Sequence, residues 1–462
     1  MIGRLLALGL MAMLTTNGSA AWANQPDTLT AKQQRWLGRE RFPIRARSFF
    51  MATDNQGDLS DAYAWGVGVG LGYQTPRLFN HLTVGGTVFF SKNLLSSDLA
   101  ARDSQTGQPN RYEIGLFDGQ NPGNHAMLSR LEELYAQYVF GKKSWVTVGR
   151  QLPRSPFINP QDGRMSPTFV EGIVLEWNER PNTQIHAEYL TRIAPRSTLG
   201  WYTIGESMGL YPVGVDATGK ASQYAGNTQS AGITQLAITQ KVGKVVLQLW
   251  DTHVQNIFNM IYARADMGIP AGKKRQVVAG LQLARQWAVG NGGNDESAKA
   301  YDQPGNRSLI FSGRVGYQTT RWTSYLNATR ITAEGRYLMP REWGRDPFYT
   351  FLMREKNEGF GDLTAVNTNL FFTPTSRIKA EASFGYYRLP DVKNSVLNKY
   401  GMPSYTQTNL SFTYRSGNFP NSWDVQLLWV LKTDVGNTYD NNRYVYNRVG
   451  MHQINLILNY RL

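Results

Sequence analysis

The feature that most constrains this chain is a strict two-residue alternation. In residues 63–73 (YAWGVGVGLGY) the odd positions hold aromatic or large aliphatic residues, and the even positions hold alanine or glycine. Alternate side chains of a β-strand leave opposite faces of the sheet, so one face of this strand is continuously apolar, with aromatic rings at both ends. That pattern is typical of a strand that faces lipid between two interfacial aromatic girdles. Soluble strands are usually shorter, about 5–6 residues.

The same alternation recurs along the chain, and the spacing predicts about 16–18 strands. The further segments are 82–90, 173–177, 185–189, 277–283, 311–317, 378–386, 410–414, 425–431 and 454–462. In lipid every backbone polar group must be paired, so a spanning sheet must close on itself. The sequence therefore predicts an all-β protein, a transmembrane antiparallel β-barrel that is wide enough to enclose water.

The first residues predict export from the cytoplasm. Arg4 precedes a short apolar run at 5–14, and Ala21-Trp22-Ala23 forms a cleavage pattern before Asn24. This is a secretory signal peptide over 1–23, because the apolar run is too short for a membrane helix. We expect a periplasmic lead-in over 24–42 and the barrel over 43–462.

Composition excludes several classes of function. The chain has no cysteine, so disulfides and thiolate metal sites are impossible, and we expect no cofactor and no metal. Its net charge is +14, yet the basic residues are scattered along strands and no nucleic-acid motif appears. We therefore expect no nucleic-acid partner. The charged fraction of 18% is below the roughly 25% of soluble domains.

The inner face of the predicted barrel carries basic side chains. Parity places Arg377 and Lys379 inward on the strand near residue 378, and Arg314 and Arg415 inward on neighbouring late strands. Cations in a water-filled tube attract carboxylates and raise their entry rate. The alternative is that these residues lie at strand ends, where they bind lipid head groups or loop carboxylates.

A proline-rich segment joins two of the strands. Residues 148–172 contain four prolines, which exclude a strand and predict a compact loop. Proline also lowers the entropy cost of holding one loop shape. Asp162 beside Arg164 could present both charge signs to a zwitterion, or could form an internal pair that fixes the loop to the wall.

This segment resembles the third loop of the OprD-type (Occ) substrate-specific porins. The matching residues of the loop are Ser155, Pro156, Asp162 and Arg164, followed by Thr168, Phe169 and Gly172. The resemblance implies a monomeric channel of about 18 strands with an inward-folded constriction loop, to which Arg154 also belongs. It also implies a ladder of basic side chains, for which Arg314, Arg377, Lys379 and Arg415 are the candidates.

The resemblance further implies an outer-membrane porin of a Gram-negative bacterium, with no enzymatic activity. We expect passive, selective diffusion of small carboxylate-bearing solutes, such as amino acids and organic acids. The expected partners are these anionic or zwitterionic solutes, outer-membrane lipid and lipopolysaccharide. The alternatives are an outer-membrane barrel with a role in export, in fatty-acid uptake or in catalysis; no G-x-S-x-G or H-E-x-x-H motif supports catalysis.

One further segment has two possible placements. Residues 340–348 (PREWGRDPF) are dense in aromatic and charged side chains. They could form a second inward loop or an ordered external one, and we favour the external placement.

Overall fold

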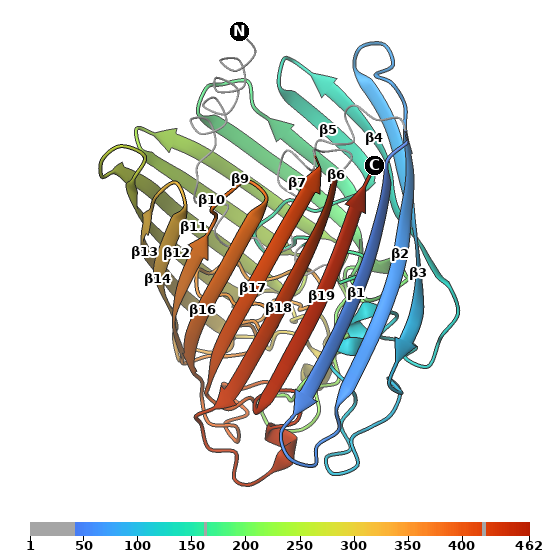
Figure 1. Cartoon of the computed structure of the whole chain (residues 1–462), viewed down its shortest axis with the longest axis vertical. Coiled ribbons are helices and arrows are strands. Elements are labelled where there is room, and N and C mark those ends of the chain that lie inside the picture. The colour runs from blue at the N-terminus through green and yellow to red at the C-terminus, as the bar shows by residue number, and fades with distance from the viewer. Residues whose placement is uncertain (1–41, 161–163, 418–421) are drawn as a thin grey trace.

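A computed structural model describes residues 42–160, 164–417 and 422–462. The expected signal peptide, all but the last residue of the expected lead-in, and Asp162 lie outside these residues. The described chain forms a barrel of long, tilted strands (Figure 1). No helix among the described residues is long and apolar enough to cross a membrane.

Eighteen antiparallel strands make the wall. The sheet has nineteen strands in all, but β8 has two residues and pairs only with the end of β7, which itself pairs with β9. The strands are β1 (Ile44–Asn55), β2 (Ala62–Gln74), β3 (Leu82–Ser96), β4 (Leu128–Phe140), β5 (Ser144–Gln151), β6 (Phe169–Trp177), β7 (Thr183–Ala194), β8 (Tyr202–Thr203), β9 (Ile233–Val242), β10 (Val245–Val254), β11 (Phe258–Pro270), β12 (Gln276–Ala288), β13 (Arg307–Gln318), β14 (Trp322–Ile331), β15 (Leu363–Phe372), β16 (Ile378–Arg388), β17 (Tyr405–Gly417), β18 (Ser422–Asp434) and β19 (Met451–Arg461). Within the described ranges, three short 3₁₀ helices lie in loops: η3 (Glu113–Leu116), η4 (Ser297–Lys299) and η5 (Asn442–Tyr444).

The last strand closes the barrel against the first. β1 and β19 pair from Arg45 opposite Arg461 to Asn55 opposite Met451. Beyond this register, the Ile44 and Leu462 backbones exchange hydrogen bonds of 2.9 and 3.1 Å. Closure leaves no unpaired strand edge in contact with lipid.

The predicted alternation is confirmed on β2. Trp65, Leu71 and Tyr73 are 41–47% exposed on the outer face, whereas Ala64 on the inner face is fully buried. Gly68 also points inward, and the Phe89 ring of β3 lies so close that a Cβ at this position would be 2.4 Å from it. A larger residue at 68 would displace that ring.

The two ends of the barrel differ in the length of their connections. At the end where the chain termini lie, hairpins turn over short segments such as 141–143, 178–182 and 319–321. At the other end, the lower one in Figure 1, the connections include the long segments 97–127, 195–232, 289–306 and 332–362. Outer-membrane barrels have short periplasmic turns and longer extracellular loops, which assigns the long connections to the cell exterior.

Several of the long connections fold into the lumen. Trp343 and Phe348 are buried, and they belong to one apolar cluster with wall residues such as Tyr262 of β11 and Ile310 of β13. The prediction that residues 340–348 are external is therefore wrong. This segment packs inside the barrel because its aromatic rings find apolar partners there.

Candidate solute pathway inside the barrel

The loop between β5 and β6, residues 152–168, folds inward. Ser155 closes a tight turn with Ile158, whose backbone N–H donates to the Ser155 hydroxyl at 3.1 Å. The turn directs the Phe157 ring into the lumen, where it makes edge contacts with Tyr262 of β11 and with Tyr337 and Phe348 of the loop 332–362. Burial of this one ring therefore fixes the tip of the loop against both the wall and a second loop.

Hydrogen bonds join these two inward loops. The backbone N–H of Asn159 donates to the Trp343 carbonyl at 3.1 Å, and its side-chain amide donates to the Arg345 carbonyl at 3.0 Å. The Arg345 N–H donates in return to the Asn159 side-chain oxygen at 3.1 Å. We call this contact the loop clasp. Thr168 extends it, because its hydroxyl donates to the Glu342 carbonyl at 3.1 Å.

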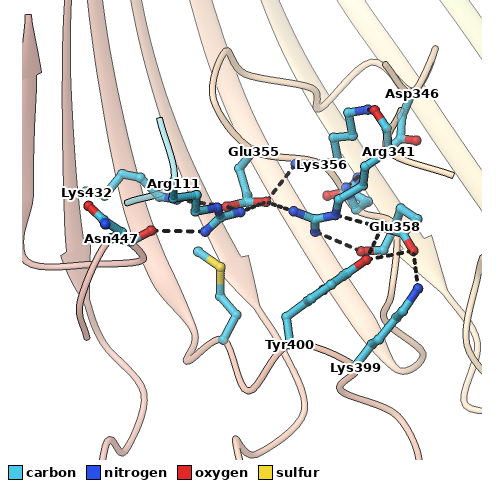
Figure 2. A network of polar contacts seen from close by, with 12 residues as sticks. Arg111, Arg341, Asp346, Glu355, Lys356, Glu358, Lys399, Tyr400, Lys432 and Asn447 are labelled. Atoms are coloured by element: carbon cyan, nitrogen blue, oxygen red, sulfur yellow. Dashed lines mark hydrogen bonds and ion pairs between the residues drawn. The ribbon is translucent and has the colours of Figure 1, made fainter. Parts of the chain in front are cut away.

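A buried charge network holds the loop 332–362 in place (Figure 2). Glu355 forms ion pairs with Arg111 at 3.0 Å, with Arg341 at 3.1 Å and with Lys432 of β18 at 3.1 Å. Three residues further along the loop, Glu358 pairs with Arg341 at 2.7 Å. The network thus connects the loop 97–127, the loop 332–362 and the wall.

Both carboxylates of this network are held ionised. Burial alone would raise the pKa of Glu355, but Arg111, Lys432 and Arg341 outweigh it and hold that pKa far below its usual range. Glu358 is also buried, yet Lys399 and Arg341 keep its pKa below the usual value. Removing one member would leave its partners charged and buried, which is strongly destabilising.

Two cavities adjoin each other on the other side of the loop 152–168. The larger, about 100 Å³, lies near the periplasmic end between this loop and the walls β1–β4 and β19. The smaller, about 20 Å³, lies further inward and is bounded by residues 197–199. Phe89 of β3 and Met165 of the loop line both cavities. These two side chains therefore mark the narrow point between them.

Arginines outnumber carboxylates along these cavities. The larger cavity is lined by Arg45, Arg47, Arg164 and Arg461 with Glu132 and Glu133, and the smaller by Arg130. Arg45 forms an ion pair of 2.5 Å with Glu132, and its guanidinium lies 4.7 Å from the centre of the Phe89 ring. A positive group is thus placed beside the narrow point.

A row of polar side chains continues from this cavity around the inner wall. Arg47 of β1 donates to the Asn459 side-chain oxygen at 2.9 Å, and Asn459 donates to Asp424 of β18 at 2.8 Å. Arg461 also bonds Asp424, at 3.0 Å. Arg415 of β17 lies directly opposite Asp424 in the strand register. We call this set, from Arg415 to Arg47, the polar row.

The predicted loop residues occupy different environments. Arg164 is buried and lines the larger cavity, with a positive φ of 43°. Ser155 is buried in its turn, and the Pro156 carbonyl accepts a hydrogen bond from Asn159 at 2.8 Å. Arg154 is exposed, with its guanidinium 5.8 Å from the centre of the Trp145 ring.

The predicted ladder residues do not form a single line. Arg314 is buried between the rings of Tyr325 and Tyr349, 4.3 and 4.2 Å from their centres. Lys379 lies 3.8 Å from Glu381 on the same strand. Of this set, only Arg415 lies in register with the polar row.

Arg377 departs from its expected position on a strand. β16 begins at Ile378, and Arg377 lies exposed in the preceding turn. Its backbone carbonyl accepts a hydrogen bond from the Arg415 N–H at 2.8 Å. Assigning side chains to the two faces by alternation fails for Arg377, because β16 begins one residue after it.

The sequence reasoning missed Arg45 and Arg47, although both occupy inward positions on β1. The signal was obscured because the next inward residues, Phe49 and Met51, are apolar and buried. They pack against Phe117 and Met165 of the inward loops rather than against lipid. The charged pair before them was the available clue, since charges on a lipid face are costly.

Known proteins share both the sequence pattern and the fold. A family described as "outer membrane porin, OprD family" matches residues 123–328. Over these residues the chain is similar to OprD-type outer-membrane porins. Family and fold indicate a channel rather than an enzyme. No curated protein matches the chain in sequence.

Solved structures of similar fold include three porins of this type. OpdK of Pseudomonas aeruginosa with vanillate is 14% identical, with a TM-score of 0.66 over 91% of this chain and 98% of its own. OccAB3 of Acinetobacter baumannii is 13% identical, with a TM-score of 0.69 over 91% and 98% of the two chains. OccK2 (OpdF) of Pseudomonas aeruginosa in complex with glucuronate is 12% identical, with a TM-score of 0.66 over 91% and 97%.

The lining of the barrel offers ion pairs rather than metal ligands. Within the described ranges, no group of three or more histidine and acidic side chains is placed to hold a metal ion. The lining groups available to a solute are therefore guanidinium, carboxylate, amide and hydroxyl groups.

Proposed function

We propose that this porin lets small carboxylate-bearing solutes, such as amino acids and organic acids, diffuse selectively down their concentration gradients. The loop 152–168 is the constriction, and the larger cavity is its periplasmic vestibule. The wall closes within one chain, so each chain forms a complete channel, and we propose that it acts as a monomer. Vanillate and glucuronate, named with two porins of similar fold, are both carboxylates, which supports the same substrate class here.

The observation that carries this proposal is the excess of arginines around the narrow point. Arg45 and Arg47 lie on β1, and Arg164 approaches from the loop on the other side of the same cavity. Guanidinium groups bind carboxylates through two parallel hydrogen bonds. In a low-dielectric passage they raise the local concentration of anions. Glu132, paired with Arg45, adds an acceptor for the ammonium group of a zwitterion.

The test is the double variant Arg45→Gln/Arg47→Gln in planar bilayers and liposomes. We expect the reversal potential in a salt gradient to move toward cation selectivity, and uptake of small carboxylates to fall on the order of tenfold. The matched control is Lys142→Gln/Lys143→Gln, which removes the same charge from an exposed turn between β4 and β5. Selectivity and uptake unchanged from wild type in the β1 variant would refute the proposal.

A further inference from the structure

The outer face of the barrel carries a cluster of arginines at its extracellular edge. Arg285 of β12, Arg307 of β13, Arg330 of β14 and Arg388 of β16 have side chains 32–61% exposed. Their neighbours along each strand alternate with them and are buried, for example Gln286 and Ile331. These arginines therefore point away from the lumen. We call them the rim arginines.

The strand register places the rim arginines side by side. Arg330 lies opposite Thr364 of β15, and Thr364 lies opposite Arg388 of β16. On the other side of β14, Arg285 of β12 lies opposite Leu309 of β13. The next residue of β13 on the same face, Phe311, lies opposite Arg330 of β14. The cluster thus covers five adjacent strands without a break.

Among the residues that the structure describes, two carboxylates neutralise the rim arginines. Glu334 bonds Arg285 at 2.8 Å and Arg307 at 3.2 Å. Asp362 bonds Arg330 and lies 4.0 Å from Arg388. Each carboxylate is shared by two guanidinium groups, so the cluster keeps a net positive charge. All six groups remain partly exposed, so the four guanidinium groups can bind a further anion.

An apolar hollow lies directly below this cluster on the lipid-facing surface. Its volume is about 770 Å³, and Arg330 and Thr364 form part of its lining. The hollow exists because small residues, Ala263, Gly313 and Ala328, alternate with large ones across the strands. A Cβ at Gly313 would meet only the Leu281 side chain, at 3.8 Å. Leu281 itself is 70% exposed on the same face.

Charge and shape together define what fits this surface. Guanidinium groups on a lipid-facing wall are costly at the bilayer midplane and cost little near the interface, so the rim arginines mark the head-group level. Arginine matches phosphate geometry with its planar fork. The apolar part of the hollow begins at Ala328, two residues below Arg330, or roughly 7 Å along the strand. An amphiphile with an anionic head and acyl chains satisfies both parts.

We propose that the rim arginines and the hollow form a binding site for the lipid A part of lipopolysaccharide. Its phosphates lie on Arg330, Arg388 and their neighbours, and an acyl chain fills the hollow over β11–β14. The site faces the outer leaflet, where that lipid resides. It is separate from the solute pathway, because all its groups project from the opposite face of the wall.

The test is native mass spectrometry of the full chain with purified bisphosphorylated lipid A in detergent. We expect retained lipid on the wild type, at least about fivefold less on Arg330→Gln/Arg388→Gln, and little retention of dephosphorylated lipid A. The matched control, Lys273→Gln/Arg275→Gln, removes the same charge from the exposed turn at the periplasmic end of β11 and β12 and should bind as wild type. Circular dichroism and heat-dependent gel mobility establish that each variant is a folded barrel.

A second variant tests the hollow without changing charge. Gly313→Leu fills the hollow from the lipid side, where its side chain has room, and should lower lipid A retention at least about threefold. Undiminished retention in Arg330→Gln/Arg388→Gln, or equal retention of dephosphorylated lipid A, would overturn the phosphate site. Undiminished retention in Gly313→Leu would overturn the acyl site.

Discussion

At the scale of single residues, most buried charges of the loops have a partner of opposite sign, and Asp302 is an exception. It is fully buried in the loop 289–306, where one carboxylate oxygen accepts a hydrogen bond from the Asn306 side chain at 2.7 Å. Burial raises the pKa of Asp302 to about 8, against the smaller opposing effects of Asn306 and Lys399. Asp302 therefore holds a proton at neutral pH.

Titration of Asp302 predicts how this loop responds to pH. Between about pH 4 and pH 8 the closed loop keeps the proton and an opened loop releases it, so opening becomes easier as pH rises through this window and levels off above it. We expect tryptic cleavage after the nearby Lys299 to accelerate with pH, by up to about tenfold per pH unit, relative to Asp302→Asn. Trypsin itself responds to pH, so the cleavage rate of the wild type is divided by the rate of Asp302→Asn at the same pH. A constant ratio from pH 5 to pH 8 would contradict this assignment.

At the scale of elements, the two inward loops depend on each other. In the loop 152–168, the Phe157 ring provides an apolar anchor through Tyr262, Tyr337 and Phe348. The loop clasp adds hydrogen bonds beside that ring. Loosening one loop should therefore loosen the other.

Truncating the anchor tests this dependence. Phe157→Ala removes a buried ring and should destabilise the inward position of the loop by about 3–5 kcal/mol. We expect the remaining contacts of the loop not to compensate for this loss. We expect larger and noisier single-channel conductance in planar bilayers, with weaker ion selectivity. Phe311→Ala, which removes a lipid-facing ring, is the control and should leave conductance unchanged. Wild-type conductance in Phe157→Ala would show that the ring does not hold the loop.

Sequence reasoning succeeded for the strands and was weaker for these loops, for a physical reason. Lipid imposes alternation on each strand separately, so β2 could be recognised from its own residues. The placement of residues 340–348 depends on Asn159 and Ser207, which are far away in the chain. Local sequence therefore did not reveal that this segment lies inside. Phe49 and Met51 show the opposite difficulty, because apolar residues that pack against inward loops cannot be told from lipid-facing ones by their own sequence.

At the scale of the whole molecule, the wall separates two solvents across one layer of backbone. On β19, Leu456 is 47% exposed on the outer face, whereas the adjacent Asn455 is fully buried on the inner face. Asn455 accepts a hydrogen bond from Arg354 of an inward loop at 2.9 Å. The strand that closes the barrel thus also helps to hold the contents of the lumen.

The depth of a residue in the bilayer should determine how much a charge costs on this strand. Leu456→Arg places a guanidinium near mid-strand and should lower the free energy of unfolding by about 2–4 kcal/mol. His452→Arg, near the extracellular end of the same face, should cost about 0–1 kcal/mol. Equilibrium denaturation in guanidinium chloride with phospholipid vesicles measures both. Equal costs at the two positions would contradict the assigned orientation of β19 in the membrane.

The loop clasp has a consequence for how such channels diversify. Its acceptors at residues 343 and 345, and two of its three donors, are main-chain atoms. Side chains at those two positions can change from one protein to another while these main-chain hydrogen bonds between the loops persist. A barrel built this way can acquire new solute preferences through single substitutions in its inward loops, without first having to evolve a new way of positioning those loops.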